Sequence, residues 1–181
     1  PVSEVIREAA EPHLDRGVEI IFELNLKSKE DISQPVIQRL PEIIHGLRNM
    51  IQNAIDFADS KVWIILSWSQ SDIKIIINDD GPGFPVQMIS RIGDPFVSYR
   101  KTSSVRSKQI EYEGMGLGLF IAKTLLERTN AKLSFSNGAS GLVDGLGNEG
   151  QIGAVVEISW ARSDIEKKTN LSGENENLNV F

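Results

Sequence analysis

The sequence predicts an α+β fold, a two-layer α/β sandwich in which three main helices cover one face of a mixed sheet of about five strands. Two observations support this prediction. Helical and strand-like hydrophobic patterns are interspersed along the chain, and two strand patterns follow one another directly instead of alternating with helices. At 181 residues, 40% hydrophobic and 24% charged, the chain is also long enough to bury one substantial core.

The first half of the chain predicts two helices with a strand between them. Residues 3–11 are amphipathic, with Ser3 as a candidate N-cap, and residues 18–26 alternate as a half-buried strand does. Residues 35–58 carry one long apolar stripe at helical spacing. Pro41 lies early in this range and indicates either a kink or a later helix start.

A hairpin follows the long helix. Residues 61–69 and 72–78 are both rich in β-branched and aromatic side chains, and only Gln70 and Ser71 separate them. The second run leads into residues 79–83, Asp-Asp-Gly-Pro-Gly, which predict a loop.

The chain after residue 84 predicts a short helix, a third main helix and two strands, at residues 85–92, 118–129, 131–137 and 152–160 respectively. Residues 138–150 contain five glycines and predict a long connection. Residues 163–181 are polar and rich in Asn, Glu and Lys, so we expect a domain over residues 1–162 and a disordered tail over 163–181.

Composition narrows the possible functions. A net charge of −6 and a pI near 5.0 argue against general nucleic-acid binding, and the absence of cysteine excludes disulfides and thiolate chemistry. The longest apolar runs have the length of strands, well short of a membrane span. The chain begins at Pro1 and shows no signal-peptide pattern, so we expect it to be a piece of a longer protein.

One stretch indicates a phosphate site. Gly114, Gly116 and Gly118 alternate immediately before an apolar helical pattern, which predicts a loop-to-helix junction with free backbone N–H groups. The preceding residues 97–110 contain four basic side chains, including Arg100 and Lys101, and no acid, as expected of a lid over an anion. The glycines alone could equally form a flexible hinge. They match neither a P-loop nor a dinucleotide fingerprint, because no Gly-Lys-Ser/Thr follows and no hydrophobic strand precedes.

Two amides in the long helix form a second candidate site. Asn49 and Asn53 are four residues apart, so both lie on one helix face. Asn is a poor helix former, so the pair is either solvated surface or a site. An Asn carbonyl oxygen can ligate Mg²⁺ that phosphate oxygens and waters also hold.

The order of these motifs resembles a known family. Asn49-x-x-x-Asn53-Ala54 on a helix, Asp79-x-Gly81-x-Gly83 after a strand, Asp94-Pro95-Phe96 and the final glycine run follow one another as the N, G1, F and G2 boxes do. These boxes define the GHKL or Bergerat ATP-binding domain of sensor histidine kinases, DNA gyrase, Hsp90 and MutL. The resemblance covers about residues 1–161.

The resemblance implies ATP and Mg²⁺ as cofactors and assigns roles to matching residues. Asn53 would ligate Mg²⁺ with help from Asn49, and the Asp79 carboxylate would accept a hydrogen bond from the adenine amine, which guanine cannot donate. Phe57 would lie beside the adenine. The other implied nucleotide-site residues let the backbone pass close to the nucleotide or form the lid and the phosphate loop: Gly81, Gly83, Phe96, Gly114, Met115, Gly116, Leu117, Gly118 and Leu119.

Two positions depart from the family pattern. Asp56, which the resemblance places in the nucleotide site, stands where the family commonly has a lysine that contacts phosphate, and Arg100 or Lys101 of the lid could replace that contact. Ala154 follows Gly153 where the family often has threonine. We therefore count Arg100 and Lys101, with Asn49 and Asn53, as the candidate catalytic residues.

One residue distinguishes kinase from ATPase. ATPases of the family have a glutamate as general base four residues before the metal-binding asparagine, where this chain has Asn49. An amide cannot accept a proton, which favours the sensor histidine kinase branch, whose histidine nucleophile brings its own lone pair. A GHKL-type ATPase and a non-catalytic nucleotide-binding module remain as alternatives.

The substrate histidine is expected on another domain. His13 and His45 are the only histidines, and neither lies in a phosphoacceptor motif. The expected partners are a dimerisation domain and a response regulator, not nucleic acid. Residues 11–18, 53–58 and 94–98 are similar to the RegB/PrrB group of redox-responsive bacterial kinases. The resemblance implies a cytoplasmic domain of a homodimeric parent in the bacterial inner membrane.

Overall fold

The computed structural model describes residues 1–25, 32–94, 117–138 and 153–167. Its helices are α1 (Val2–Ala10), α2 (Pro41–Phe57), α3 (Gly118–Glu127) and α4 (Arg162–Ile165), with the short 3-10 helices η1 (Glu11–His13) and η2 (Val86–Arg91). Its strands are β1 (Glu19–Leu24), β2 (Lys61–Trp68), β3 (Asp72–Asp79), β4 (Lys132–Asn137) and β5 (Ala154–Ala161). None of the helices in these ranges is both long and apolar enough to cross a membrane.

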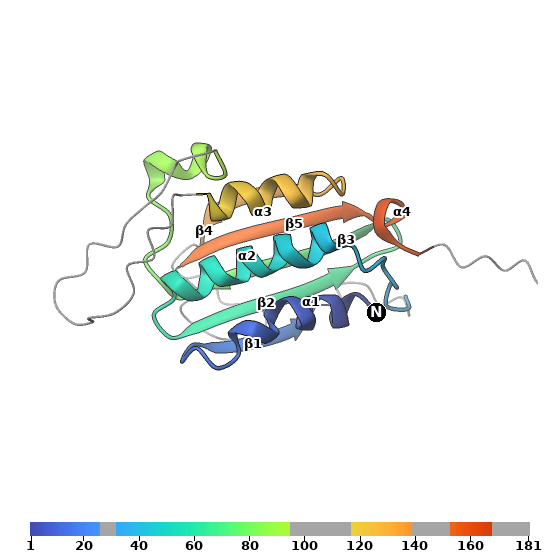
Figure 1. The fold of residues 1–181 in the computed structure, drawn as a ribbon, viewed down its shortest axis with the longest axis horizontal. Helices are drawn as coiled ribbons and strands as arrows, with labels where there is room; N and C mark the ends of the chain where they lie inside the picture. Colours follow the sequence, from blue (N-terminus) through green and yellow to red (C-terminus); the bar gives the residue numbers. More distant parts are fainter. Residues whose placement is uncertain (26–31, 95–116, 139–152, 168–181) are drawn as a thin grey trace, which may run out of the picture.

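The strands form one mixed sheet in the order β1-β2-β3-β5-β4. β1 runs parallel to β2, and the remaining neighbours are antiparallel, including the predicted β2–β3 hairpin. α1, α2 and α3 lie side by side over one face of the sheet (Figure 1). The predicted α+β two-layer sandwich is therefore confirmed.

The core lies between the helices and the sheet. Alternate residues of the central strands point into it, as Ile64, Ile75 and Ile158 show, each with at most 1% of its surface exposed. Helix α2 packs closely on α3 because position 46 is glycine. A Cβ there would lie 2.5 Å from Cγ of Leu126.

The start of α1 differs from the prediction, and the start of α2 decides between the two alternatives that Pro41 left open. The proposed Ser3 cap is wrong: α1 begins at Val2, whose N–H donates to the carbonyl of Pro35 at 3.0 Å. Helix α2 begins at Pro41, the later of the two possible starts. Proline suits this first position, because its fixed φ fits the helix and its missing N–H would have had no helical partner.

The folded part continues beyond residue 162, where the polar tail was predicted to begin. Ile165 of α4 is 1% exposed, and Glu166 forms an isolated antiparallel bridge with Ile37. The polar composition of this segment concealed one buried apolar anchor. The prediction that the domain ends at residue 162 is therefore wrong for residues 163–167, which belong to the fold.

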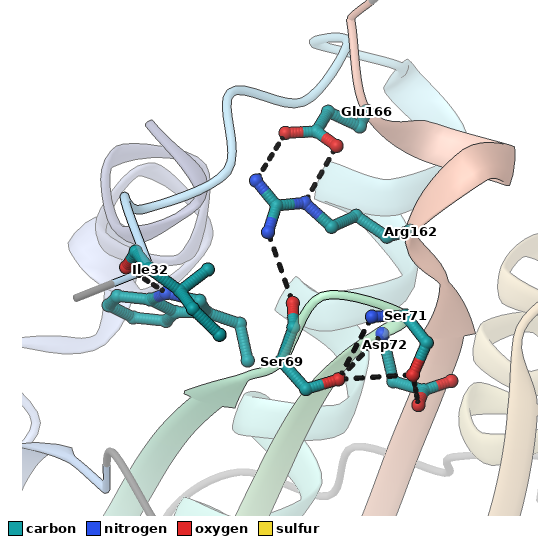
Figure 2. Close-up of polar contacts among 7 residues, drawn as sticks. Ile32, Ser69, Ser71, Asp72, Arg162 and Glu166 are labelled. Carbon is teal, nitrogen blue, oxygen red and sulfur yellow. Dashed lines mark hydrogen bonds and ion pairs between the residues drawn. The ribbon is translucent and has the colours of Figure 1, made fainter. Parts of the chain in front are cut away.

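Side-chain hydrogen bonds join α4 to the β2–β3 hairpin (Figure 2). Arg162 makes two bonds of 2.7 Å with the carboxylate of Glu166 and donates to the carbonyl of Ser69 at 3.0 Å. The Oγ of Ser69 accepts the N–H groups of Ser71 and Asp72, which closes the turn. The turn end of the hairpin is thereby held by Arg162 of α4.

Candidate functional site

Three of the described candidate residues, Phe57, Asp79 and Gly81, lie together where β3 ends and where β2 and β5 begin. Asp79, the last residue of β3, faces Val62 of β2 in the register, and its neighbour Asn78 faces Val155 of β5. Helix α2 ends at Phe57, four residues before β2 starts at Lys61. Segments far apart in sequence therefore meet at this end of the sheet.

Asp79 is a buried acceptor. The residue is 2% exposed, and its Oδ1 accepts the N–H groups of Gly81 at 2.9 Å and Ala154 at 3.2 Å. Burial raises the pKa of Asp79 above its ordinary value, although these two hydrogen bonds favour the charged form. A carboxyl group in this setting discriminates strongly between a donor and an acceptor presented by a ligand.

Two glycines allow the backbone segments around Asp79 to touch. A Cβ on Gly81 would lie 2.1 Å from the carbonyl oxygen of Phe57 at the end of α2. A Cβ on Gly153 would lie 2.0 Å from the carbonyl oxygen of Asp79 and 2.4 Å from its Oδ1. The sequence motifs contain both glycines, but only the structure shows that each makes room for a particular backbone segment.

The turn after β3 is also fastened to β4. The side-chain amide of Asn137 accepts the N–H of Phe84 at 2.7 Å and donates to its carbonyl at 2.8 Å. Gly83 has a φ of +75°, and a Cβ there would lie 2.8 Å from Oδ1 of Asn137. Sequence reasoning missed Asn137, because nothing in a strand pattern indicates that its last residue clamps a distant turn.

Asp80 is a second residue that the sequence did not single out. Its carboxylate accepts the backbone N–H groups of Asp59, Ser60 and Lys61, at 2.8 to 3.1 Å, and the hydroxyl of Ser60 at 2.5 Å. Burial acts to raise the pKa of Asp80, but the hydrogen bonds from Lys61, Ser60 and Asp59 together outweigh burial and lower it. Asp80 therefore fixes the turn between α2 and β2 beside the candidate site.

Replacing Asp80 by asparagine is expected to lower the free energy of unfolding at pH 7 by about 1–2 kcal/mol, because charge-assisted bonds to three backbone N–H groups are weakened. A lowered pKa in the folded state stabilises the fold above the ordinary pKa of 3.8, and this stabilisation is lost as the pH falls. The difference between variant and wild type should thus shrink below about pH 4. Urea denaturation at pH 7 and pH 3 measures this difference in stability, and Asp164→Asn, at an exposed position, is the control for the loss of one charge. Equal stability of Asp80→Asn and wild type at pH 7 would contradict the role of Asp80 in holding the turn.

The predicted asparagines lie on one face of α2. Asn49 and Asn53 are both partly exposed, and neither side chain is held by a hydrogen bond to another described residue. Asp56 is exposed on the same face, where its Oδ1 accepts the amide of Gln52 at 2.6 Å and pairs with Arg16 at 3.3 Å. Sequence reasoning missed Arg16, because no local pattern relates residue 16 to residue 56.

The described residues do not form a metal site by themselves. They contain no group of three or more His, Cys, Asp or Glu side chains that could hold an ion. The amides of Asn49 and Asn53 fit Mg²⁺ only if the phosphate oxygens of a ligand and water molecules fill the remaining coordination positions. The donor set thus matches a metal that arrives with a nucleotide.

Leu117 and the first two residues of α3 are the part of the predicted phosphate loop that lies within the described ranges. Gly118 is its first residue and is exposed, and a Cβ there would meet no atom within 4 Å, while Leu117 accepts the N–H of Ile121 at 2.8 Å. Leu119 packs against the core. The other predicted residues of the lid and loop lie outside the described residues: Phe96, Arg100, Lys101, Gly114, Met115 and Gly116.

The two histidines occupy different environments. His45 is exposed on α2, whereas His13 ends η1, is 5% exposed, and has an Nε2 without a partner among the described residues. Burial, followed by the charges of Arg16 and Arg48, lowers the pKa of His13. The burial of His13 agrees with the expectation that the substrate histidine lies on another domain.

Comparison with known proteins identifies similar chains. Residues 39–163 match the family model described as histidine kinase-, DNA gyrase B- and HSP90-like ATPase. The chain is 54% identical over 160 residues to the sensor histidine kinase RegB of Cereibacter sphaeroides, covering 88% of this chain and 35% of that protein. It is 29% identical over 100 residues to the C4-dicarboxylate transport sensor protein DctB of Pseudomonas aeruginosa, covering 52% of this chain and 15% of that protein. The chain thus spans about a third or less of the length of these curated relatives.

Solved structures show the same fold. The mycobacterial sensor histidine kinase MprB superposes with a TM-score of 0.63 at 22% identity, covering 88% of this chain and 95% of that chain. The catalytic domain of histidine kinase ThkA, in a nucleotide-free form, superposes with a TM-score of 0.63 at 20% identity, covering 89% of this chain and 94% of that chain.

Proposed function

The chain belongs to the family of histidine kinase-, DNA gyrase B- and HSP90-like ATPases, and on that basis we propose that it is the catalytic ATP-binding part of a two-component sensor histidine kinase. It transfers the γ-phosphoryl group of ATP to a histidine on a separate domain. The observation that carries the proposal is the buried Asp79 carboxylate, held by the N–H groups of Gly81 and Ala154 at the end of α2. The similarity to RegB over 88% of the chain supports the kinase branch.

The proposed adenine site lies at Asp79. Its carboxylate accepts the hydrogen bond of the adenine amine, while Phe57, partly exposed at the end of α2, contacts the base. Gly81 lets the turn lie against the carbonyl of Phe57, and Gly83 lets it lie against the side chain of Asn137, because a Cβ at either position would collide with these groups. Burial of Asp79 makes this selection strong, because a guanine would leave the carboxylate facing an acceptor.

The proposed phosphate site runs along the exposed face of α2 toward the start of α3. Asn53 would hold Mg²⁺ with Asn49 beside it, and the bound ion would neutralise phosphate charge. Gly118, Leu117 and Leu119 belong to the proposed phosphate loop together with the predicted residues outside the described ranges. Arg100 and Lys101 of the predicted lid are proposed to neutralise charge on the transferred group.

The chemical step needs little from this domain beyond positioning. A histidine nitrogen from the separate domain attacks the γ-phosphorus in line, the new N–P bond forms, and the bond to the ADP oxygen breaks. Asn49 cannot serve as a general base for water, so we propose that hydrolysis is slow. A GHKL-type ATPase, the alternative, would require such a base.

The proposal extends to the parent protein. The partners are its own dimerisation and phosphoacceptor domain and a response regulator, and the parent is a homodimer of the bacterial inner membrane with this domain in the cytoplasm. The folded domain and a polar tail remain a proposed division, with the fold reaching at least residue 167. Redox control, as in the RegB/PrrB group, is part of the proposal.

A phosphotransfer assay tests the function. The 181-residue chain, mixed with a RegB-type phosphoacceptor domain and γ-labelled ATP, is expected to label that domain's histidine in the presence of Mg²⁺. Asn53→Ala is expected to reduce the transfer rate at least about a hundredfold, because the metal loses its protein ligand. No transfer despite ATP binding would favour a non-catalytic module, and steady hydrolysis without the acceptor would favour the ATPase.

A further inference from the structure

Asp56 places a negative charge beside the proposed phosphate site. It lies three residues after Asn53, on the same face of α2, and its side chain is 46% exposed. One helical turn spans about 5 Å, so an unpaired carboxylate here would repel the phosphates of a nucleotide bound at Asn53. A compensating cation is therefore needed at this point.

Arg16 supplies a cation from a distant loop. One terminal nitrogen of its guanidinium lies 3.3 Å from Oδ1 of Asp56, and the side chain is 41% exposed. A guanidinium has five N–H donors in a planar fork, so pairing through one nitrogen leaves donors for a second anion. The geometry of this fork fits two oxygens of a phosphate group.

The loop that carries Arg16 is built to hold it there. His13 is buried, and the N–H of Arg16 donates to its carbonyl at 3.4 Å. Gly17 takes a φ of +79°, which a side chain would strain, and the N–H of Glu19 then bonds to the carbonyl of Ser60 in the turn after α2. The loop is thus anchored on both sides of Arg16 and fastened to the end of α2.

The ion pair itself contributes little to folding. Exposed pairs of this kind are typically worth less than about 1 kcal/mol. Removing Arg16 should therefore leave thermal stability nearly unchanged, so any effect on ligand binding can be measured separately from stability.

We propose that Arg16 is a phosphate-contacting residue of the nucleotide site, positioned by Asp56 to contact the phosphates beyond the first. The proposal rests on the proposed nucleotide-binding function. In this chain Arg16, held by Asp56, would make the phosphate contact that a lysine at position 56 of α2 commonly makes in the family. It also assigns a ligand contact to a loop that no sequence motif indicates.

Calorimetric titration of Mg²⁺·ADP and of AMP into the 181-residue chain tests this. Arg16→Gln is expected to weaken ADP binding about tenfold and to change AMP binding less than about twofold, because only the outer phosphate loses a charge-assisted contact. Arg39→Gln is the matched control. Arg39 also pairs with a partly exposed carboxylate, that of Glu8, but it lies before the start of α2, and that start is roughly 22 Å from Asp56 by the helix rise of about 1.5 Å per residue.

The double variant Arg16→Gln/Asp56→Asn shows whether Arg16 contacts phosphate directly or only neutralises the charge of Asp56. If Arg16 contacts phosphate, ADP binding stays weak when Asp56 is also neutral. Recovery of wild-type ADP affinity in the double variant, or wild-type affinity in Arg16→Gln alone, would overturn the inference while leaving the nucleotide site standing. A wild-type chain that binds neither ADP nor AMP would instead overturn the proposed function, and the inference with it.

Discussion

Replacing Asp79 by asparagine is expected to lower the affinity for Mg²⁺·ADP at least about a hundredfold without unfolding the chain. The asparagine carbonyl can still accept the N–H groups of Gly81 and Ala154, as Oδ1 of Asp79 does at 2.9 and 3.2 Å. Its NH₂ group would then occupy the second oxygen position and face the adenine amine, donor against donor. A buried unpaired donor of this kind is costly.

Calorimetric titration of Mg²⁺·ADP and Mg²⁺·GDP into wild type and Asp79→Asn measures this effect. Wild type should prefer ADP, and the variant should lose that preference. Asp80→Asn is the matched neighbour: it is expected to cost stability and to keep the preference for ADP, because its carboxylate binds only the turn after α2. ADP binding untouched by Asp79→Asn would refute the placement of the adenine.

Replacing Gly153 by alanine is expected to lower the free energy of unfolding by about 3 kcal/mol or more. The added Cβ would lie 2.0 Å from the carbonyl oxygen of Asp79 and 2.4 Å from its Oδ1, and neither the strand backbone nor a buried carboxylate can move aside cheaply. The start of β5 must therefore separate from the end of β3. Because the N–H of Ala154 bonds to Asp79, nucleotide binding should weaken as well.

Gly118→Ala provides the control for this substitution. A Cβ on Gly118 meets no atom within 4 Å, and alanine favours a helix over glycine by about 1 kcal/mol. Urea denaturation should therefore show Gly118→Ala equal to or more stable than wild type. A Gly153→Ala variant as stable as wild type would show that β5 and β3 are not in contact as described.

Local patterns were sufficient to predict most of the elements. Two runs rich in β-branched and aromatic residues, 61–69 and 72–78, predicted the β2–β3 hairpin, because only two residues separate them. The apolar stripe of α2 predicted the long helix, because a helix of this fold must bury one face against the sheet. Local patterns failed at the ends. Ser3 lies inside the helix because α1 already begins at Val2, whose N–H has a partner in Pro35, and the fold extends past residue 162 because Ile165 is buried.

Some residues of the candidate site were predicted from the sequence, and others are seen only in the tertiary structure. The sequence by itself determined the order of the motifs, and the family resemblance of that order predicted Asn49, Asn53, Asp79 and Gly81 as candidate site residues. The hydrogen bonds that Asp80 and Asn137 accept, and the contact between Arg16 and Asp56, were decided only by the tertiary structure. Each joins residues at least 19 positions apart, and chain segments so separated are brought together by the packing of the sheet and helices, which no local pattern encodes.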